Sequence, residues 1–220
     1  MRAATLLVPL LFCAGAVRAG PAVRTGLAVS GLLCSNQDFR PYLGYEVDYL
    51  QDVGYPQYGP QLSVAWETRL LDFLTLRPEL GFVQRGYHLN QIRLYNSSYK
   101  VRISYLELPV LLRAGLSRGR VRPGVLAGPY AALRLAATGR LLDQGLVATR
   151  PLSTVAPFDY GLVLGLDSEV AARRGQLVFE LRFNLGLANV MRADPRFVEL
   201  YADPDRVRVL SVGVMTGYRF

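Results

Sequence analysis

The segment from Gln176 to Ala188 reads QLVFELRFNLGLA, in which large apolar residues recur at every second position. In an extended chain, one face would carry Leu177, Phe179, Leu181, Phe183, Leu185 and Leu187. The opposite face would carry Glu180, Arg182, Asn184 and Gly186. Because successive side chains of a strand point to opposite faces, this two-residue period predicts a β-strand with one apolar face and one charged face.

The same alternation recurs along the chain and predicts eight strands of similar length. They are expected at Val23–Leu33, Gln57–Arg69, Asp72–Arg85, Tyr99–Leu116, Arg120–Ala136, Pro157–Ala171, Gln176–Ala188 and Arg208–Phe220. Within Tyr99–Leu116 the apolar phase slips near Tyr105 and Leu106, which predicts a β-bulge in that strand.

The connections between these strands alternate between short and long. Tight turns are expected at Leu70–Asp72, Ser117–Gly119 and Arg173–Gly175. Long loops are expected at Ser35–Pro56, Gly86–Ser98, Thr138–Ala156 and Asn189–Asp205. Outer-membrane barrels have an even number of strands, short periplasmic turns and longer extracellular loops, so the alternation fits that class.

A closed barrel also explains why charged residues stand in the middle of apolar strands. After residue 20 no window holds 18 uninterrupted apolar residues, so no transmembrane helix is expected. A sheet can cross hydrocarbon only when closed on itself. We therefore predict an all-β fold, an eight-stranded antiparallel transmembrane up-and-down β-barrel with paired charges inside. The alternative, a soluble exported sandwich or lipocalin-like barrel, would normally turn its apolar faces inward.

The N-terminus predicts export. Arg2 precedes an apolar run from Ala3 to Val17, and small residues follow at the end of that run, as in a secretory signal peptide. We expect a signal peptide at residues 1–19 and one outer-membrane β-barrel domain at residues 20–220. A buried N-terminal helix is disfavoured because Pro9 would break it.

Cysteine usage and charge narrow the classes further. After cleavage Cys34 alone remains, so no intramolecular disulfide is expected. The formal net charge is +8, and Lys100 is the only lysine, so almost all of the positive charge is carried by arginine. Because an exported chain rarely meets nucleic acid, we interpret these arginines as partners of lumen carboxylates or of anionic lipid headgroups.

Several motifs resemble one known family. The stretch Tyr105–Arg113, YLELPVLLR, resembles the "YLEIPLLLK" strand of the PorT-like outer-membrane β-barrel family found in Bacteroidetes. Gly128-Pro129-Tyr130 resembles its "GPY" strand, Asp159–Glu169 its glycine-rich strand, and Phe179–Val190 its "lelRYxxGLxNI" strand. Asp167 and Phe183 depart from the pattern, where glycine and tyrosine are common. The resemblance implies an eight-stranded barrel but no single activity, and one branch of the family is linked to secretion and gliding machinery.

Residues that could carry chemistry are scattered. His88 lies near the outer rim, where Ser97, Ser98, Asp143 or Asp159 could accompany it in a rim enzyme, but no spacing supports a triad. An acid/base pair or cation site could draw on Glu79, Glu107, Asp159, Asp167, Glu169 and Glu180. Their abundant arginine neighbours favour a structural lumen network instead: Arg77, Arg85, Arg113, Arg134, Arg182 and Arg219. We predict no catalytic residue, no cofactor and no metal site, since neither a Cys/His cluster nor a phosphate loop is present.

Aromatic residues suggest membrane interfaces and partners. Tyr42, Tyr45, Tyr49, Tyr55 and Tyr58 crowd the first long loop and, with Trp66, favour an interfacial girdle or loop packing over a binding surface. The terminal Phe220 is of the kind that barrel assembly machinery is thought to recognise. Expected partners are therefore outer-membrane lipid and lipopolysaccharide, the assembly machinery, and an envelope protein bound through the outer loops.

The functional expectation follows from these points. We expect a structural or interaction protein of the outer membrane that acts through its extracellular loops, with an association with envelope or secretion machinery. One alternative is a narrow outer-membrane channel or transport protein. Another is a rim-site enzyme, a lipid A or peptide hydrolase.

Overall fold

The computed structural model describes residues 20–34, 53–91, 97–116, 118–143, 146–190 and 207–220. The predicted signal peptide at residues 1–19 lies outside these ranges and stays a prediction. The strands are β1 (Pro21–Cys34), β2 (Val53–Trp66), β3 (Thr68–Leu71), β4 (Leu74–Gln91), β5 (Ser97–Gly115), β6 (Val121–Asp143), β7 (Leu146–Pro151), β8 (Phe158–Ala172), β9 (Gly175–Gly186) and β10 (Val207–Arg219). In the described ranges no helix has the length and apolarity needed to cross a membrane.

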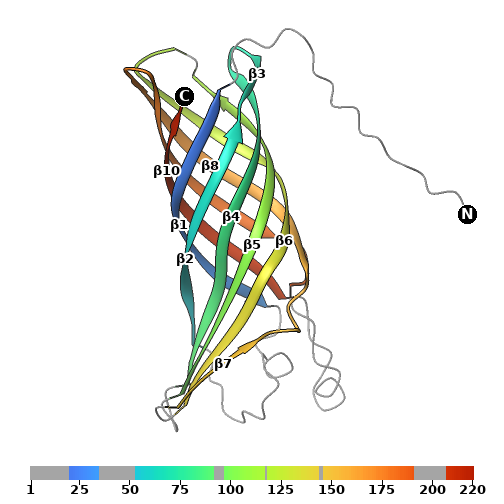
Figure 1. Cartoon of the computed structure of the whole chain (residues 1–220). Helices are drawn as coiled ribbons and strands as arrows, with labels where there is room; N and C mark the ends of the chain where they lie inside the picture. The colour runs from blue at the N-terminus through green and yellow to red at the C-terminus, as the bar shows by residue number, and fades with distance from the viewer. Residues whose placement is uncertain (1–19, 35–52, 92–96, 117, 144–145, 191–206) are drawn as a thin grey trace, which may run out of the picture.

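Eight of the described strands close into a ring (Figure 1). Around the ring the order is β1, β2, β4, β5, β6, β8, β9 and β10, with antiparallel pairing throughout. β10 pairs back onto β1, from Ala22 opposite Arg219 to Cys34 opposite Val207. β3 continues along β4 after β2 ends, and β7 extends β6 as a hairpin. The predicted eight-stranded antiparallel barrel is confirmed.

The two ends of the barrel differ as the loop lengths predict. At the short-turn end lie the turns at residues 72–73, 118–120 and 173–174, together with the start of β1 and the end of β10. Gly119 serves the middle turn with a φ of 107°, a conformation that residues with a side chain rarely adopt. The other four connections leave from the opposite end, which we call the long-loop end.

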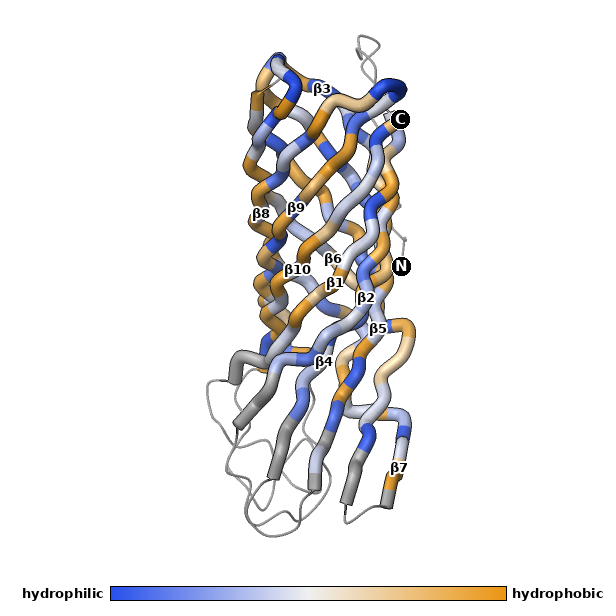
Figure 2. The backbone as a smooth tube through the Cα atoms, turned by 90° about the vertical axis from the view of Figure 1, so that its left-hand side faces the viewer, coloured by the Kyte–Doolittle hydropathy of each residue, from blue (hydrophilic) through white to orange (hydrophobic). Residues whose placement is uncertain are grey.

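Side chains alternate across the barrel wall as predicted. Along β8, Leu164 is 59% exposed on the outside, whereas the neighbouring Val163 is fully buried in the lumen. In β9, Glu180 and Arg182 point inward and Phe179 and Phe183 point outward. Figure 2 shows the result as alternating hydrophilic and hydrophobic residues along strands such as β8 and β9. The apolar exterior and the charged interior are the reverse of a water-soluble globule.

The predicted bulge lies in the neighbouring strand. β5 keeps a regular alternation, with Ile103, Tyr105 and Glu107 all inward. The register instead shifts in β6, where Ser104 pairs with Ala136 and Tyr105 pairs with Arg134, which leaves Leu135 as the extra residue. The apolar phase of β5 slips because the lumen changes from charged to apolar at this level, and not because the backbone is interrupted.

Two of the predicted long loops are largely strand. β4 continues to Gln91 and β5 begins at Ser97, so most of the loop expected at Gly86–Ser98 is paired backbone. The loop expected at Thr138–Ala156 contains the end of β6 and all of β7. Where β4 and β5 extend, the phase of the alternation is reversed, with Tyr87 and Val101 inward and His88 and Arg102 outward. The extension therefore does not continue the row of apolar outward residues by which the strands were recognised.

The exposed apolar wall predicts a difference between two identical substitutions. Leu164 and Leu70 are both exposed, but Leu164 lies at mid-height of the wall and Leu70 at the short-turn end. An arginine on the lipid face near the bilayer midplane costs about 2 to 4 kcal/mol, and about 0 to 1 kcal/mol near an interface. Leu164→Arg should therefore lower the free energy of unfolding in phospholipid vesicles by several times as much as Leu70→Arg. Denaturant titration in vesicles measures both, and equal losses would contradict a lipid-facing wall.

Candidate functional site

A network of ion pairs fills the part of the lumen nearer the short-turn end. We call this set the lumen network; among the described residues it contains Arg24, Arg77, Arg113, Arg182, Arg219, Glu67, Glu79, Asp167, Glu169 and Glu180. These five arginines and five carboxylates cancel in formal charge. Each predicted carboxylate in this set has at least one arginine partner, so the predicted pairing inside the barrel is observed.

The network joins opposite walls. β4 and β9 stand four places apart in the ring of eight, which makes them diametrically opposite. Arg77 Nη2 on β4 donates to Glu180 Oε2 on β9 at 2.8 Å. Arg182 Nη2 on β9 donates to Glu79 Oε1 on β4 at 2.8 Å. These two bonds run in opposite directions across the lumen and therefore block it.

Further pairs extend the network toward the short-turn end. Arg24 Nη2 donates to Glu67 Oε1 at 2.6 Å, and Arg113 Nε donates to Asp167 Oδ2 at 2.6 Å. Arg219 donates to Glu169 and also to Glu67. Buried charges are tolerated when they are paired and hydrogen-bonded, and removing one partner is strongly destabilising. The network is therefore a set of mutually dependent charges.

Arg24 and Glu67 were absent from the residues singled out in the sequence. The signal that identifies them is the same alternation: Arg24 shares a face with Ala22 and Ala28, and Glu67 follows Ser63 and Ala65 on theirs. Both faces are buried. Small inward neighbours leave room for a long side chain, and a lone charge among them indicates a lumen partner.

A second, smaller group lies next to the network, farther from the short-turn end. Arg85 Nη2 donates to Glu107 Oε2 at 2.5 Å and Arg85 Nη1 donates to Asp159 Oδ2 at 3.4 Å. Tyr130 Oη donates to the same Asp159 oxygen at 2.9 Å. The guanidinium carbon of Arg85 lies 5.0 Å from the ring centre of Tyr130 and 5.9 Å from that of Tyr105, within cation–π range. We call these five residues the central cluster.

The space between the network and the central cluster is nearly filled. A cavity of about 10 Å³ lies there, bordered by Gln61, Ser63, Glu79, Glu107 and Arg182. That volume is close to the smallest that holds one water molecule. Gly161 allows the Tyr130 ring of the central cluster to pack closely against β8. A Cβ atom at residue 161 would lie 2.7 Å from Cε1 of Tyr130.

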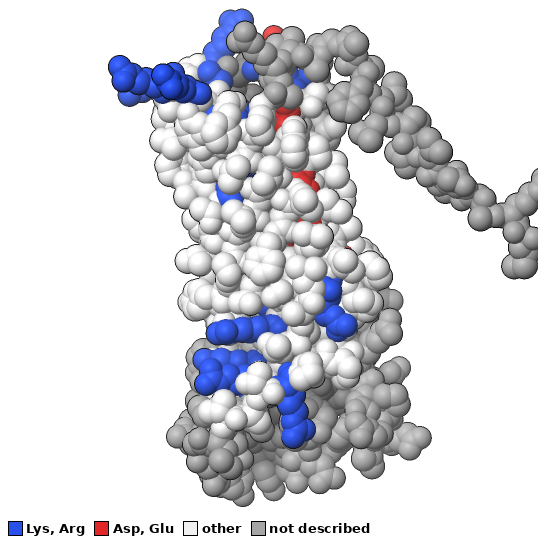
Figure 3. Space-filling model, in the orientation of Figure 1, with Lys and Arg blue, Asp and Glu red and all other residues white. Residues whose placement is uncertain are grey.

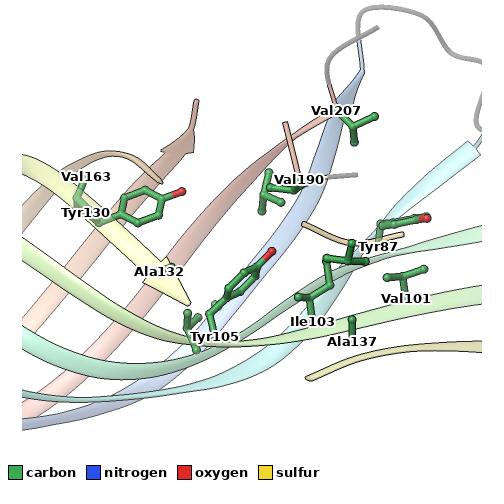
Figure 4. Close-up of a cluster of buried hydrophobic side chains, with 14 of the residues drawn as sticks. Tyr87, Val101, Ile103, Tyr105, Tyr130, Ala132, Ala137, Val163, Val190 and Val207 are labelled. Carbon is green, nitrogen blue, oxygen red and sulfur yellow. The ribbon is translucent and has the colours of Figure 1, made fainter. Parts of the chain in front are cut away.

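An apolar cap closes the lumen toward the long-loop end (Figure 4). We use this name for Tyr87, Val101, Ile103, Ala137, Val155, Val190 and Val207, all of them buried. Val155 reaches the cap from the segment after β7, which turns inward: Leu152 N donates to Ala137 O at 3.0 Å, and Ala156 N to Val190 O at 2.8 Å. The chain itself thus covers the mouth.

Arg134 does not join the predicted ion-pair network. Its Nη1 donates instead to the carbonyl oxygens of Leu152 and Val155. The bulge at Leu135 places Arg134 beside the inward-turned segment, out of reach of the network. Arg134 therefore holds the covering segment in place, which the sequence does not reveal.

The residues imagined for a rim enzyme are not brought together where the structure describes them. His88 lies on the outer side of β4, opposite Lys100 in register. Asp159 is in the central cluster, 1% exposed, on the inner side of the wall. Ser98 pairs with Asn90 near the end of β4, and the side chains of Ser97 and Asp143 lie outside the described residues. Among described residues no group of three or more His, Cys, Asp and Glu side chains could hold a metal ion.

Aromatic side chains form belts at both ends of the apolar wall. Trp66 and Phe220 are 55% and 68% exposed near the short-turn end, and Tyr58 and Phe158 are 64% and 65% exposed toward the long-loop end. Such girdles mark the two interfaces of transmembrane barrels. The exposure and position of Tyr58 and Trp66 agree with the girdle interpretation, which stays a prediction. Tyr42, Tyr45 and Tyr49 lie outside the described residues, as does the side chain of Tyr55.

Comparison with known proteins agrees with this architecture. The sequence matches the family described as "Outer membrane protein beta-barrel domain" over residues 23–192. None of the curated proteins matches it.

Solved structures similar to the chain include Ail, the attachment invasion locus protein of Yersinia pestis, solved with the heparin analogue sucrose octasulfate (14% identity, 93% of this chain and 100% of that chain, TM-score 0.43). Neisserial surface protein A is another (13%, 93% and 100%, TM-score 0.39). The outer membrane protein OprG from Pseudomonas aeruginosa is a third (10%, 91% and 96%, TM-score 0.47). The assignment of the fold rests on the closed ring of strands and on the family match.

The central cluster supports a test of the buried charges. Within the described chain, Arg85 is the cation that pairs with both Glu107 and Asp159. The substitution Arg85→Met therefore leaves two buried carboxylates without a cation. We expect the free energy of unfolding to fall by about 3 to 5 kcal/mol. The triple variant Arg85→Met, Glu107→Gln, Asp159→Asn removes all three charges and should recover most of this loss.

Denaturant titration in vesicles measures both variants. Arg173→Met, which alters an exposed turn, is the matched control and should change stability by less than about 0.5 kcal/mol. A triple variant no more stable than the single one would show that unpaired charge is not the cause.

Proposed function

Because this chain belongs to the outer membrane protein beta-barrel domain family, we propose that it is a non-enzymatic outer-membrane protein that acts through the loops of its long-loop end. The family and the closed barrel place it among outer-membrane β-barrels. In such barrels the long loops are extracellular. The finer role is our inference, and it rests on one observation, the filled lumen.

The filled lumen supports surface action over transport. Bonds from Arg77 to Glu180 and from Arg182 to Glu79 cross the lumen, and the apolar cap covers it. A solute path would require breaking buried ion pairs and displacing the segment held by Arg134. The alternative of a narrow channel is therefore the weaker one. A rim enzyme is also weaker, because His88 and Asp159 lie on opposite sides of the wall.

We further propose that the chain belongs to the PorT-like branch and associates with envelope or secretion machinery. The four strand motifs at Tyr105–Arg113, Gly128–Tyr130, Asp159–Glu169 and Phe179–Val190 support this. Tyr130, Asp159 and Gly161 from these motifs meet in or beside the central cluster. Packing around this cluster therefore explains why these residue types occur together in the motifs. We also propose export by the signal peptide and assembly through Phe220, which is exposed at the end of the strand that closes the ring.

The interaction role can be tested by loop replacement. Residues 35–52 and 191–206 connect strands at the long-loop end and lie outside the described residues. We expect the full chain, pulled down from detergent-solubilised outer membrane, to recover an envelope protein in stoichiometric amount. Replacing residues 36–50 or 192–204 by a short Gly/Ser linker should abolish that recovery, whereas the control variant Arg118→Gln, Arg173→Gln at the other end should not. Unchanged recovery from both loop variants, with heat-modifiable gel mobility retained, would contradict the proposal.

Because the lumen is filled, we also predict that the barrel does not conduct ions. Purified full-length protein in a planar lipid bilayer should show no steady openings, because charged pairs and the cap occupy the lumen. Steady conductance that disappears on changing Arg182 or Glu180 would favour the channel instead.

A further inference from the structure

Three cations stand together on the outer wall near the long-loop end. Lys100 on β5 lies directly opposite Arg140 on β6, and Arg102 follows two residues farther along β5. All three side chains point outward, Arg102 and Arg140 exposed and Lys100 half-buried. We call these three residues the basic row. Figure 3 shows Lys and Arg side chains gathered on this part of the surface, with no Asp or Glu among them.

Within the described chain nothing neutralises the basic row. None of its members forms an ion pair with another described residue. The carboxylates whose side chains the structure describes lie in the lumen, except Asp72, which is in a turn at the opposite end. Like charges placed directly opposite on neighbouring strands are destabilising. Lys100 opposite Arg140 is thus a destabilising arrangement unless an anion lies between them.

The height of the basic row identifies where that anion would be. The outward residues from Leu116, which directly follows β5, back to Leu106 are all apolar. These ten steps of about 3.3 Å, tilted by about 40°, rise about 25 Å, which is the height of the apolar band of an outer-membrane barrel. The band ends at Ser104, whose hydroxyl accepts a hydrogen bond from Gln84 Nε2 on β4 at 3.5 Å. Arg102 is the next outward residue, about 10 Å beyond Leu106, at the layer of lipid headgroups.

From this charge, exposure and height, we propose that the basic row binds the phosphate groups of an anionic glycolipid in the outer leaflet. Two guanidinium groups and one ammonium suit phosphate oxygens, since arginine binds them in a bidentate manner and lysine acts as a point charge. The apolar wall below the row lies where the acyl chains of the same lipid would run. The inference does not depend on the proposed loop function, but it does take the long-loop end to be extracellular.

Binding can be measured with the folded full chain in zwitterionic detergent, by native mass spectrometry. The probes are bis-phosphorylated lipid A and the same lipid with its phosphates removed. We expect the phosphorylated lipid to bind more tightly, and the variant Lys100→Gln, Arg102→Gln, Arg140→Gln to bind it about tenfold to a hundredfold more weakly. The matched control, Arg118→Gln, Arg120→Gln, Arg174→Gln, removes three exposed cations at the short-turn end and should bind as the wild type does.

Three binding results would overturn the proposal: equal affinity for the two lipids, no loss in the basic-row variant, or an equal loss in the control. Displacement of the lipid by an equal concentration of inorganic phosphate would also overturn it, because the site would then recognise free phosphate. Heat-modifiable gel mobility shows whether each variant is folded. If the triple variant does not fold, Lys100→Gln alone is compared in the same way.

A stability measurement separates lipid from acidic residues of the chain's own loops. Without anionic lipid, relief of the Lys100 and Arg140 repulsion should leave the basic-row variant at least as stable as the wild type. Adding lipid A should then stabilise the wild type more than the variant. A variant that is already less stable in lipid-free micelles would show that the row is neutralised within the protein, and the lipid proposal would fail.

Discussion

Backbone hydrogen bonding is the constraint on which the rest of this structure depends. A strand in hydrocarbon has no water to satisfy its amide and carbonyl groups, so every edge must be paired. The described sheet meets this requirement by joining β10 to β1 over thirteen consecutive residue pairs, from Ala22–Arg219 to Cys34–Val207. Once the ring is closed, each strand has one lipid face and one lumen face, and the sequence alternation follows from that division.

Closure also creates the problem that the lumen network solves. A ring of eight strands encloses a space just wide enough for side chains to fill. Here charged residues fill the part nearer the short-turn end, and they can do so only because arginines and carboxylates from opposite walls meet, as Arg77 and Glu180 do. Near the long-loop end the chain uses apolar residues instead, and Arg134 satisfies its hydrogen bonds on backbone carbonyls. Both solutions leave the described lumen filled, which is why we propose that contacts with other molecules are made by the outer wall and the loops.

The sequence predicted the wall better than the interior. Strand positions, facing and closure follow from a period of two residues, and Glu180 with Arg182 were correctly placed inside. The partners of each charge could not be predicted, because Arg24 and Glu79 approach through the ring order and not through sequence spacing. The bulge was assigned to β5 because lumen chemistry changes there, and the extensions of β4 and β6 were missed because their outward residues are polar. The alternation of apolar and polar residues reflects what each face of a strand contacts. Beyond the apolar band the outer face no longer contacts hydrocarbon, so the outward residues there are no longer apolar.

Asp167 illustrates how a departure from a pattern is accommodated by its neighbours. It stands where the resembling family commonly has glycine, yet it is buried on the lumen side. Its cross-strand partner on β6 is Gly124, and a Cβ atom there would lie 2.5 Å from Asp167 Oδ1 and 2.9 Å from Cζ of Arg113. At this level the glycine is in β6 instead of β8. The space beside Gly124 admits both the Asp167 carboxylate and the Arg113 guanidinium, which lie 2.6 Å apart. The packing and the charge balance at this position therefore depend on residues from three strands. A substitution of Arg113, Gly124 or Asp167 affects the packing or the ion pair of the other two.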